Sequence, residues 1–544
     1  MKNFFFKKNL LTLLFFLSIF ALGSLIFNDY GISIDEDNSR VNGFVSLKYI
    51  LELLNSNLLI DLNNVLSVPS IHSYTEQGNG VVFETPLALI EILFKIENTR
   101  DIYLLRHYLT FLIFYVFIIF FFLLLKKRFN SILLASLGVL FLVLSPRIFA
   151  QSFYNSKDII FMSLNFINLY FGIKYLEKSN LRNGLIFAIF SGLSVGIRLL
   201  GIYLTFIVLI LRIIQILRSN DNFKKQIFNF LATLLLIFFF IYLFWPYLWA
   251  DPISNFYEAF HNIGNHKTGL YNFFLSEYTP AIFVPWYYVF VWVGITTPLV
   301  YLILFLLGIF FVFKRIIVRI INIEQKKTFN DLWRGNKEKI DFLIFLGIFL
   351  PSLIIIVMHS SLYTGWRHMY FIYPFLIYFS VYLINLANIL YFKKNKYLFF
   401  LIFISIIPTF IWMIKNHPFQ YVYFNSIVKK NFNKFFEMDY WGVSNYHSLE
   451  YILSQNRNKE IIYVGILGNG DLNLSKNFLS NEDKKKLVIT SDLNKADFLV
   501  DNFARWNGDY KFIEKLKIEN KYKIYYQIKV NEVAISSIYT NTFK

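Results

Sequence analysis

The chain of 544 residues contains no cysteine, and only 16% of its residues are charged. Without cysteine there are no disulfide bonds, no thiolate metal sites and no cysteine nucleophile. Hydrophobic residues make up 56% of the chain and aromatic residues 20%. Because a soluble globular fold cannot hide so much apolar surface, we expect an α-helical polytopic membrane protein.

Acidic residues are also scarce, since 53 Lys and Arg face only 35 Asp and Glu and leave a net charge of +18. The basic residues stand in short clusters between apolar runs, a pattern that marks the cytoplasmic side of membrane proteins and not a nucleic-acid groove. The clusters are Lys7-Lys8, Lys126-Lys127-Arg128, Lys224-Lys225, Lys314-Arg315, Lys326-Lys327 and Lys393-Lys394.

The apolar runs predict about 11 transmembrane helices, the first of them an uncleaved span after Lys7-Lys8 that leaves the N-terminus in the cytoplasm. Between the first two spans, residues 41–54 and 87–96 predict helices that lie in the membrane interface. The predicted spans are 10–27, 102–125, 132–144, one starting at 158, two within 184–218, 227–245, one ending at 314, 342–358, one ending at 393, and 397–413.

The last part of the chain differs from the rest, because no apolar run after Lys415 is long enough to cross a membrane. Short apolar segments at 461–467, 486–490 and 522–530 alternate with charged stretches and predict strands. We therefore divide the chain into a transmembrane domain, 1–414, and a soluble α/β domain, 415–544. An odd number of spans places that domain outside the cytoplasm.

The acidic stretch Asp35-Glu36-Asp37 follows the first span directly. Neighbouring carboxylates close to hydrocarbon are costly, so such a cluster is most easily kept where a substrate, a cation or a basic partner offsets the charge. The alternative is a solvated loop in which Asp37 or Ser39 caps the next helix.

Mixtures of acidic, basic and aromatic residues occur mainly in the predicted outer loops, including 145–158 and 359–368. Chemistry on that side lacks nucleotide triphosphates, so a transferase there needs an activated donor that crosses with a lipid, such as a polyprenyl-phosphate sugar. Inverting transfer to a hydroxyl requires a carboxylate base, for which Asp35 is the candidate.

A departing phosphate needs cationic support at the outer membrane edge. The candidates are Arg147, Lys157, Arg198, Arg367 and His368. Each arginine has an alternative role, in which it only extends to the lipid headgroups. The sequence identifies no certain cofactor and leaves a divalent cation open, for which Glu84 with His261 or His266 is a weak candidate site.

Several strings in the chain are typical of one family. They are Asp35-Glu36, the stretch ending in Phe83-Glu84-Thr-Pro86, Asn155-Ser-Lys157-Asp158, Gly192-Leu-Ser-Val-Gly196-Ile-Arg198, Gly365-Trp-Arg367-His368, His417-Pro-Phe-Gln-Tyr-Val-Tyr-Phe-Asn425 and Asp439-Tyr-Trp441-Gly442. With these motifs the chain resembles the GT-C superfamily of integral-membrane glycosyltransferases, specifically bacterial relatives of the dolichyl-phosphate-mannose protein mannosyltransferases (glycosyltransferase family 39).

The resemblance implies a GT-C fold in the bacterial inner membrane and a polyprenyl-phosphate-linked sugar donor used on the periplasmic side. The family's catalytic acid maps onto Asp35, with Glu36 completing the pair, and a second acid maps onto Asp158. The acceptor is a glycan, a lipid or a protein. The predicted substrate-binding residues are His72, Tyr74, Glu84, Tyr154, Trp366, Asp439 and Trp441.

Two other classes of protein stay open at this point. A transporter or flippase would line a path through the middle of the membrane with ionisable residues and show repeated halves, and no internal repeat is evident. A non-catalytic scaffold presenting the C-terminal domain would have Asp35, Asp158 and Arg198 far apart.

Overall fold

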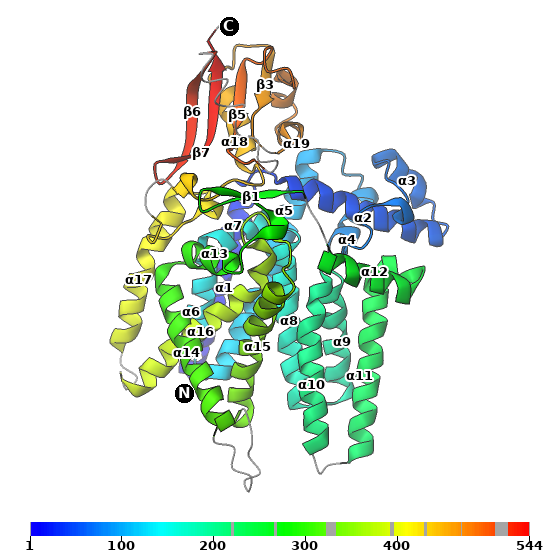
Figure 1. The fold of residues 1–544 in the computed structure, drawn as a ribbon, viewed down its shortest axis with the longest axis vertical. Coiled ribbons are helices and arrows are strands. Elements are labelled where there is room, and N and C mark those ends of the chain that lie inside the picture. The colour runs from blue at the N-terminus through cyan, green and yellow to red at the C-terminus, as the bar shows by residue number, and fades with distance from the viewer. Residues whose placement is uncertain are drawn as a thin grey trace.

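The structure is a computed structural model that describes residues 2–218, 222–265, 269–321, 333–391, 396–428, 432–468, 470–505 and 521–542. It is a helical bundle with a small β-sheet at one end (Figure 1). Eight helices in the described ranges are long and apolar enough to cross a membrane. They are α5 (Thr99–Phe129), α8 (Asp158–Glu177), α10 (Ile202–Arg218), α11 (Phe223–Phe244), α14 (Leu299–Ile321), α15 (Gly335–Val357), α16 (Tyr373–Leu390) and α17 (Lys396–Lys415).

A ninth candidate span is the pair α6 (Ile132–Val143) and α7 (Pro146–Tyr154), which is bent by 70°. Two shorter apolar helices complete the set: α9 (Leu181–Val195) and the apolar part of α1 (Lys2–Ile26). All of these helices except α7 fall at the predicted positions. The chain is therefore a multi-pass membrane protein.

The prediction of an outer loop over 145–158 is wrong. Pro146 occupies the first turn of α7, where its fixed φ suits a helix and its missing N–H leaves no donor unsatisfied. Every residue of α7 is buried. Because apolar residues such as Phe149 and Phe153 anchor this segment between its neighbours, it forms a helix within the protein and not a solvated loop.

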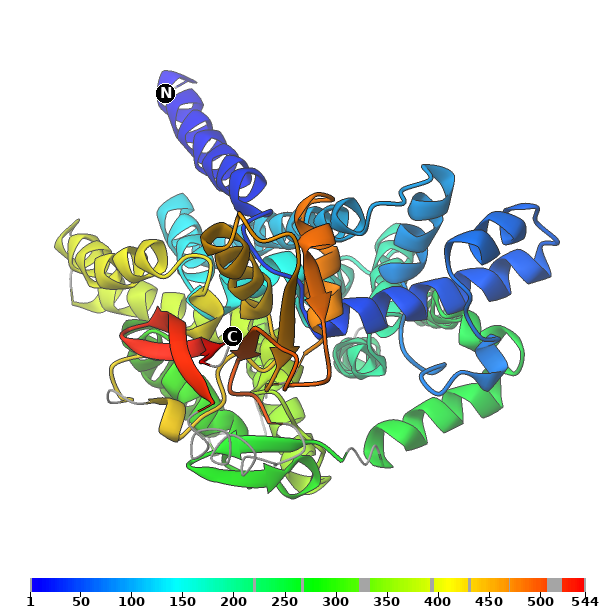
Figure 2. The same ribbon diagram turned by 90° about the horizontal axis from the view of Figure 1, so that it is seen from above.

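A layer of shorter helices lies across the end of the bundle that carries the sheet, while the N-terminus lies at the opposite end (Figure 1). The layer comprises α2 (Ile34–Leu53), α3 (Leu58–Val65), α4 (Glu84–Leu93) and α12 (Pro252–Asn265). Seen from above, α2, α3 and α12 extend to one side of the C-terminal sheet (Figure 2). Helices α2 and α4 correspond to the two predicted interfacial helices. A separate hairpin, β1 (Tyr271–Phe274) and β2 (Glu277–Pro280), precedes α13 (Tyr288–Thr296).

The C-terminal sheet has five strands in the order β4-β3-β5-β7-β6. They are β3 (Ile462–Ile466), β4 (Leu487–Ile489), β5 (Phe498–Asp501), β6 (Tyr522–Val530) and β7 (Val533–Asn541), accompanied by α18 (Ser444–Gln455), α19 (Leu472–Asn477) and α20 (Asp483–Lys486). Strand β3 is parallel to β4 and β5, and β7 is antiparallel to β5 and β6. Strands β3, β4 and β6 match the three predictions. The domain division at 414/415 stays a prediction.

The segment before α2 is fixed against both the bundle and the C-terminal part of the chain. The Tyr30 ring stacks on Phe153 of α7 at 4.7 Å between ring centroids, and Phe153 stacks on Phe111 of α5 at 5.3 Å. A Cβ atom at Gly31 would lie 2.3 Å from the carbonyl oxygen of Val443, so only glycine permits this close approach. These contacts determine where α2 begins, and therefore where Asp35 lies.

Candidate active site

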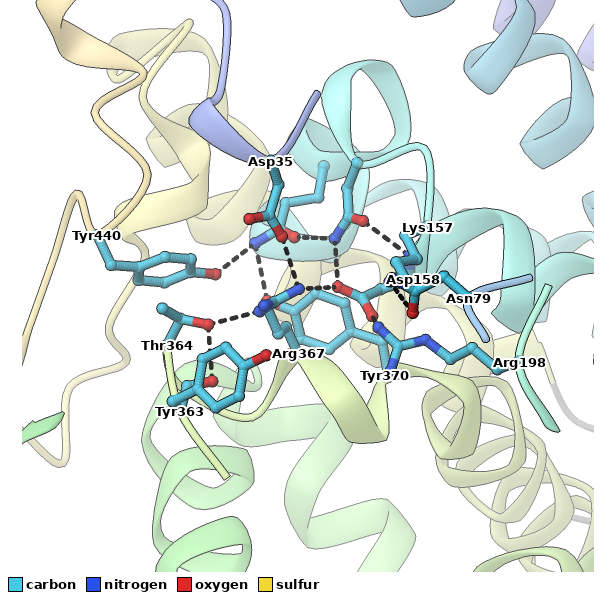
Figure 3. Close-up of polar contacts among 12 residues, drawn as sticks. Asp35, Asn79, Lys157, Asp158, Arg198, Tyr363, Thr364, Arg367, Tyr370 and Tyr440 are labelled. Atoms are coloured by element: carbon cyan, nitrogen blue, oxygen red, sulfur yellow. Dashed lines mark hydrogen bonds and ion pairs between the residues drawn. The ribbon is translucent and has the colours of Figure 1, made fainter. Parts of the chain in front are cut away.

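Arg367 connects the two aspartates that the sequence singles out. Its Nη1 lies 2.9 Å from Oδ2 of Asp35 and 3.2 Å from Oδ2 of Asp158, and Arg198 pairs with the other oxygen of Asp158 (Figure 3). Residues from four distant parts of the chain thus form one cluster of two carboxylates and two guanidinium groups. The Asp35 side chain is 31% exposed, whereas that of Asp158 is 1% exposed.

The partial exposure of Asp35 follows from its place in the first turn of α2. Its neighbour Glu36 turns the other way, because successive residues on a helix point about 100° apart. Oε2 of Glu36 accepts from the backbone N–H of Ser33 at 2.8 Å in a capping box, and Oε1 lies 2.9 Å from Nε2 of His107. Glu36 therefore stabilises the start of the helix and lies outside the Asp35 cluster.

A tight turn before Arg367 sets the direction of the Arg367 side chain. Thr364 and Gly365 both have positive φ, 56° and 68°, a backbone conformation that favours glycine at the second position. The N–H of Gly365 donates to Oε1 of Glu437 at 2.7 Å, and the guanidinium of Arg367 lies over the rings of Tyr363 and Trp441 at 5.1 and 5.0 Å. This packing holds the cation without neutralising it.

Asp158 is the first residue of α8, and Asn155 fixes it from both sides. The Asn155 side chain accepts from the Asp158 backbone N–H at 2.8 Å and donates to Oδ2 of Asp158 at 3.1 Å. Beside it, Nζ of Lys157 donates to Oδ1 of Asn79 at 3.1 Å. Burial and the nearby Arg198 hold the pKa of Lys157 below its usual range.

Helix α7 and the residue that caps its C-terminus contribute a row of polar side chains at intervals of four residues: Arg147, Gln151 and Asn155. Nε2 of Gln151 donates to the hydroxyl oxygens of Tyr370 at 2.8 Å and Tyr440 at 3.0 Å, and its Oε1 accepts from Asn155 at 2.7 Å. The row thus runs from Asn155, which contacts Asp158, back along α7 to Arg147.

Arg147 is a buried cation without a carboxylate among its hydrogen-bond partners in the described ranges. Its Nη2 donates to the carbonyl oxygen of Tyr423 at 3.4 Å, while Nε and Nη1 are buried and have no hydrogen-bond partner. Its guanidinium faces the rings of Trp292 and Phe424 at 5.4 and 5.6 Å. An unpaired buried charge is costly, so this position favours an anionic ligand.

Glu437 lies near this cation and was not singled out from the sequence. Burial raises the pKa of its carboxyl group to about 7, although the N–H of Gly365 and the charge of Arg147 act in the opposite direction. A carboxyl group with such a pKa changes charge close to neutral pH.

The tail segment after α17 and helices α14 and α17 line an open cavity of about 620 Å³. Its lining residues include Tyr423 and Phe424, two of the residues that contact Arg147. A second, much smaller cavity is lined by Lys157, Glu84, Ser39 and Asn42.

Three of the predicted substrate-binding residues have structural contacts of their own. Trp366 is buried and donates from Nε1 to Oγ1 of Thr296 at 2.9 Å. Asp439 accepts from the backbone N–H groups of Val443 and Ser444 before α18, and burial raises its pKa. Glu84 pairs with Arg106 of α5 and accepts from Oγ of Ser156 at 2.6 Å, and burial raises its pKa as well.

The remaining predicted residues have contacts in different parts of the structure. Tyr154 lies edge to face with Trp441 at 6.1 Å, close to Arg367. His368 contacts the ring of Tyr363 at 4.7 Å. Tyr74 donates to Oδ1 of Asn42, and burial together with Glu76 raises its pKa to about 12.

Two of the predicted histidines are exposed and lie apart from the cluster. His72 contacts the Tyr49 ring at 5.5 Å, and His261 stacks on Tyr257 of α12 at 6.1 Å. His266 lies outside the described residues. Within the described part of the chain, no group of three or more His, Cys, Asp or Glu residues could hold a metal ion.

Among the residues that the sequence did not reveal, Gln151 and Asn155 had a signal in the sequence. With Arg147 they form a polar row at helical spacing, which identifies one face of a helix once residues 146–154 are recognised as helical. Tyr370, Tyr440 and Glu437 have no such pattern, because only the tertiary packing brings them to α7.

The fold and the comparison with known families agree on the class of protein. Residues 86–245 match the family model described as dolichyl-phosphate-mannose-protein mannosyltransferase. The match and the apolar helices support a membrane glycosyltransferase of the GT-C type. The matched part of the chain is similar to the dolichyl-phosphate-mannose protein mannosyltransferases, a family that implies a lipid-linked sugar donor and an acceptor at the membrane. No curated protein matches the chain.

Proposed function

We propose that the protein moves a sugar from a polyprenyl-phosphate donor to an acceptor hydroxyl with inversion, with Asp35 as the general base. The observation that carries this proposal is the cluster in which Arg367 joins Asp35 and Asp158, next to the unpaired Arg147. Asp35, Asp158 and Arg198 are thus close together, which favours an enzyme over a non-catalytic scaffold.

The balance of charge supports an anionic donor. Arg198 and Arg367 compensate Asp35 and Asp158, so Lys157 and Arg147 remain as additional cations of this region. Glu437 offsets only part of this charge, since its pKa of about 7 leaves it partly protonated at neutral pH. A phosphate group would complete the balance and accept charge-assisted hydrogen bonds from Arg147.

The reaction requires one displacement. Asp35 removes the proton of the acceptor hydroxyl, whose oxygen forms a bond to C1 of the sugar as the bond from C1 to the phosphate oxygen breaks. The leaving polyprenyl phosphate keeps the bonding electron pair, and the proton remains on Asp35. The 31% exposure of the Asp35 side chain gives an acceptor access, while cations near the leaving group stabilise its charge.

The 620 Å³ cavity supports the same assignment, because its walls suit the apolar tail of the donor. Only 22% of the apolar segment of α14 and 17% of that of α17 is buried inside the protein, so both helices face the surrounding lipid. With the tail in this cavity, the phosphate of the donor would lie near Arg147, because Tyr423 and Phe424 both line the cavity and contact Arg147.

For the orientation, we propose that the end carrying the cluster and the sheet faces the periplasm of a bacterial inner membrane. The basic clusters at the ends of α5 and α14 support this, since they lie at the opposite end of the bundle from the sheet (Figure 1). The acceptor, whether glycan, lipid or protein, would then be extracytoplasmic.

The test compares Asp35→Asn with Asp37→Asn in a deletion strain, with envelope glycans and glycolipids measured by mass spectrometry. Asp37 lies in the same helical turn and accepts from the Tyr103 hydroxyl at 2.7 Å, so it controls for the loss of a carboxylate from α2. We expect Asp35→Asn to reduce the modification about 10²–10⁴-fold and Asp37→Asn to keep it. Full modification by Asp35→Asn, at equal protein level in the membrane, would refute the role of Asp35.

A further inference from the structure

The β6–β7 hairpin of the C-terminal sheet reaches down to the outer end of α17 (Figure 1). Its turn residues, Asn531 and Glu532, have positive φ values of 50° and 67°, which make a tight reversal. Nε1 of Trp412 on α17 donates to Oδ1 of Asn531 at 2.7 Å. The turn is therefore fixed to a helix that the sequence places in the membrane.

The hairpin divides its buried side chains between two hydrophobic cores. Near the turn, Ile528, Val530, Val533 and Ile535 belong to the same core as the membrane helices. Further along β7, Ile538 belongs to the core of the C-terminal sheet. The turn end of the hairpin is thus built into the transmembrane part of the protein and does not merely touch it.

This same turn forms part of the wall of the 620 Å³ cavity. Asn531 and Glu532 line it together with residues of α14, α17 and the tail segment. The α17 side of the wall includes Thr409 and Trp412, and the Trp412 ring lies edge to face with Tyr423 at 4.7 Å. Tyr423 in turn accepts from Arg147. A continuous set of contacts therefore joins the hairpin turn to the unpaired cation.

We propose that the β6–β7 turn closes the outer end of this cavity and contacts the polyprenyl-phosphate donor there, so that the C-terminal domain is part of the donor site. This inference rests on the proposed function, because it takes the occupant to be the lipid-linked donor. The apolar walls would hold the first isoprene units, the turn would cover them from the aqueous side, and Arg147 would bind the phosphate.

A photocrosslinking experiment tests the contact directly. The photoreactive amino acid p-benzoylphenylalanine is placed at Glu532 or, as a control, at the exposed Lys523 near the other end of β6, and the purified full chain is illuminated with tritiated undecaprenyl phosphate. We expect capture at position 532 that excess unlabelled undecaprenyl phosphate removes, and none at 523. No capture at 532, equal capture at both positions, or competition by phosphatidylglycerol at the same concentration would overturn the inference.

A matched pair of substitutions tests whether the closure matters for binding. Trp412→Phe removes the hydrogen bond to Asn531, while Trp286→Phe makes the same change at a tryptophan that is 68% exposed and does not line the cavity. We expect the Kd for undecaprenyl phosphate to rise about fivefold to tenfold in the first variant, the loss expected for one hydrogen bond, and to stay unchanged in the second. Equal values for both would overturn the inference.

The two proposals fail in distinguishable ways, because capture and affinity are measured without sugar transfer. The same crosslinking in an Asp35→Asn background should still label position 532. Labelling there with full transfer by Asp35→Asn would refute the base and leave the hairpin contact standing. Loss of transfer in Asp35→Asn without labelling at 532 would refute the hairpin contact alone.

Discussion

The same chemical change at the two aspartates bound by Arg367 should have opposite consequences. Asp158 is buried and interacts with Arg198, Arg367 and Asn155, so Asp158→Asn leaves two guanidinium groups without their shared carboxylate. Removing one partner from a buried ion pair costs about 3–5 kcal/mol. Asp35 is partly exposed and has a single ion pair, so Asp35→Asn should cost only about 1 kcal/mol or less in stability.

Two measurements are compared. The first is thermal unfolding of the purified proteins in one detergent, and the second is the envelope modification described for Asp35→Asn. We expect Asp158→Asn to lower the unfolding midpoint clearly, and Asp35→Asn to leave it near that of the wild type while transfer is lost. A double variant, Asp158→Asn with Arg198→Gln, removes one of the uncompensated charges and should be more stable than Asp158→Asn alone.

Either of two results would refute the role given to the ion pairs of Asp158. One is an Asp158→Asn protein as stable as Asp35→Asn, which would mean that the buried carboxylate does not compensate the two arginines. The other is additive destabilisation in the double variant, since additivity would show that Asp158 and Arg198 do not interact.

Two further predictions concern the cation next to the cavity and the carboxyl group beside it. Arg147→Gln should raise the Kd for undecaprenyl phosphate about 10–100-fold. The unfolding midpoint should not fall, because the guanidinium has no carboxylate partner to lose. A marked loss of stability with unchanged affinity would contradict this prediction. The pKa of Glu437 is about 7 in the folded protein against 4.5 ordinarily, so the folded state binds its proton more tightly than the unfolded state. The free energy of unfolding should therefore fall by about 3 kcal/mol as the pH rises from about 4.5 to about 7, and Glu437→Gln should remove this part of the pH dependence; identical pH profiles of the two proteins would contradict it.

Much of the architecture follows from the sequence because its signals are local. A run of apolar residues predicts a span wherever it occurs, and the long apolar helices α5, α8, α10, α11 and α14–α17 lie at the predicted positions. Period-two apolar segments predicted β3, β4 and β6, whereas β5 with only four residues and β7 with its nearly continuous burial were not predicted.

The contacts within the site could not be predicted from local patterns in the sequence. Asp35, Asp158, Arg198 and Arg367 were candidates from residue type and position, since charges at a membrane edge are costly and need a reason. The sequence named Asp35 as the base and Glu36 as the second member of the pair, but it could not show that their side chains have different partners, because the direction of each side chain depends on where α2 begins. That start is set by contacts of Tyr30 and Gly31 with residues more than a hundred positions away.

What the sequence by itself determined is the set of membrane-spanning helices, the α/β character of the C-terminal part and the charged residues that are candidates for the site. Only the tertiary structure decided that Arg367 joins Asp35 to Asp158, that Gln151 and Asn155 continue a row from Arg147, and that Glu437 supports the turn before Arg367. The physical reason is that hydropathy and helical periodicity act over neighbouring residues, while these contacts depend on how distant helices pack.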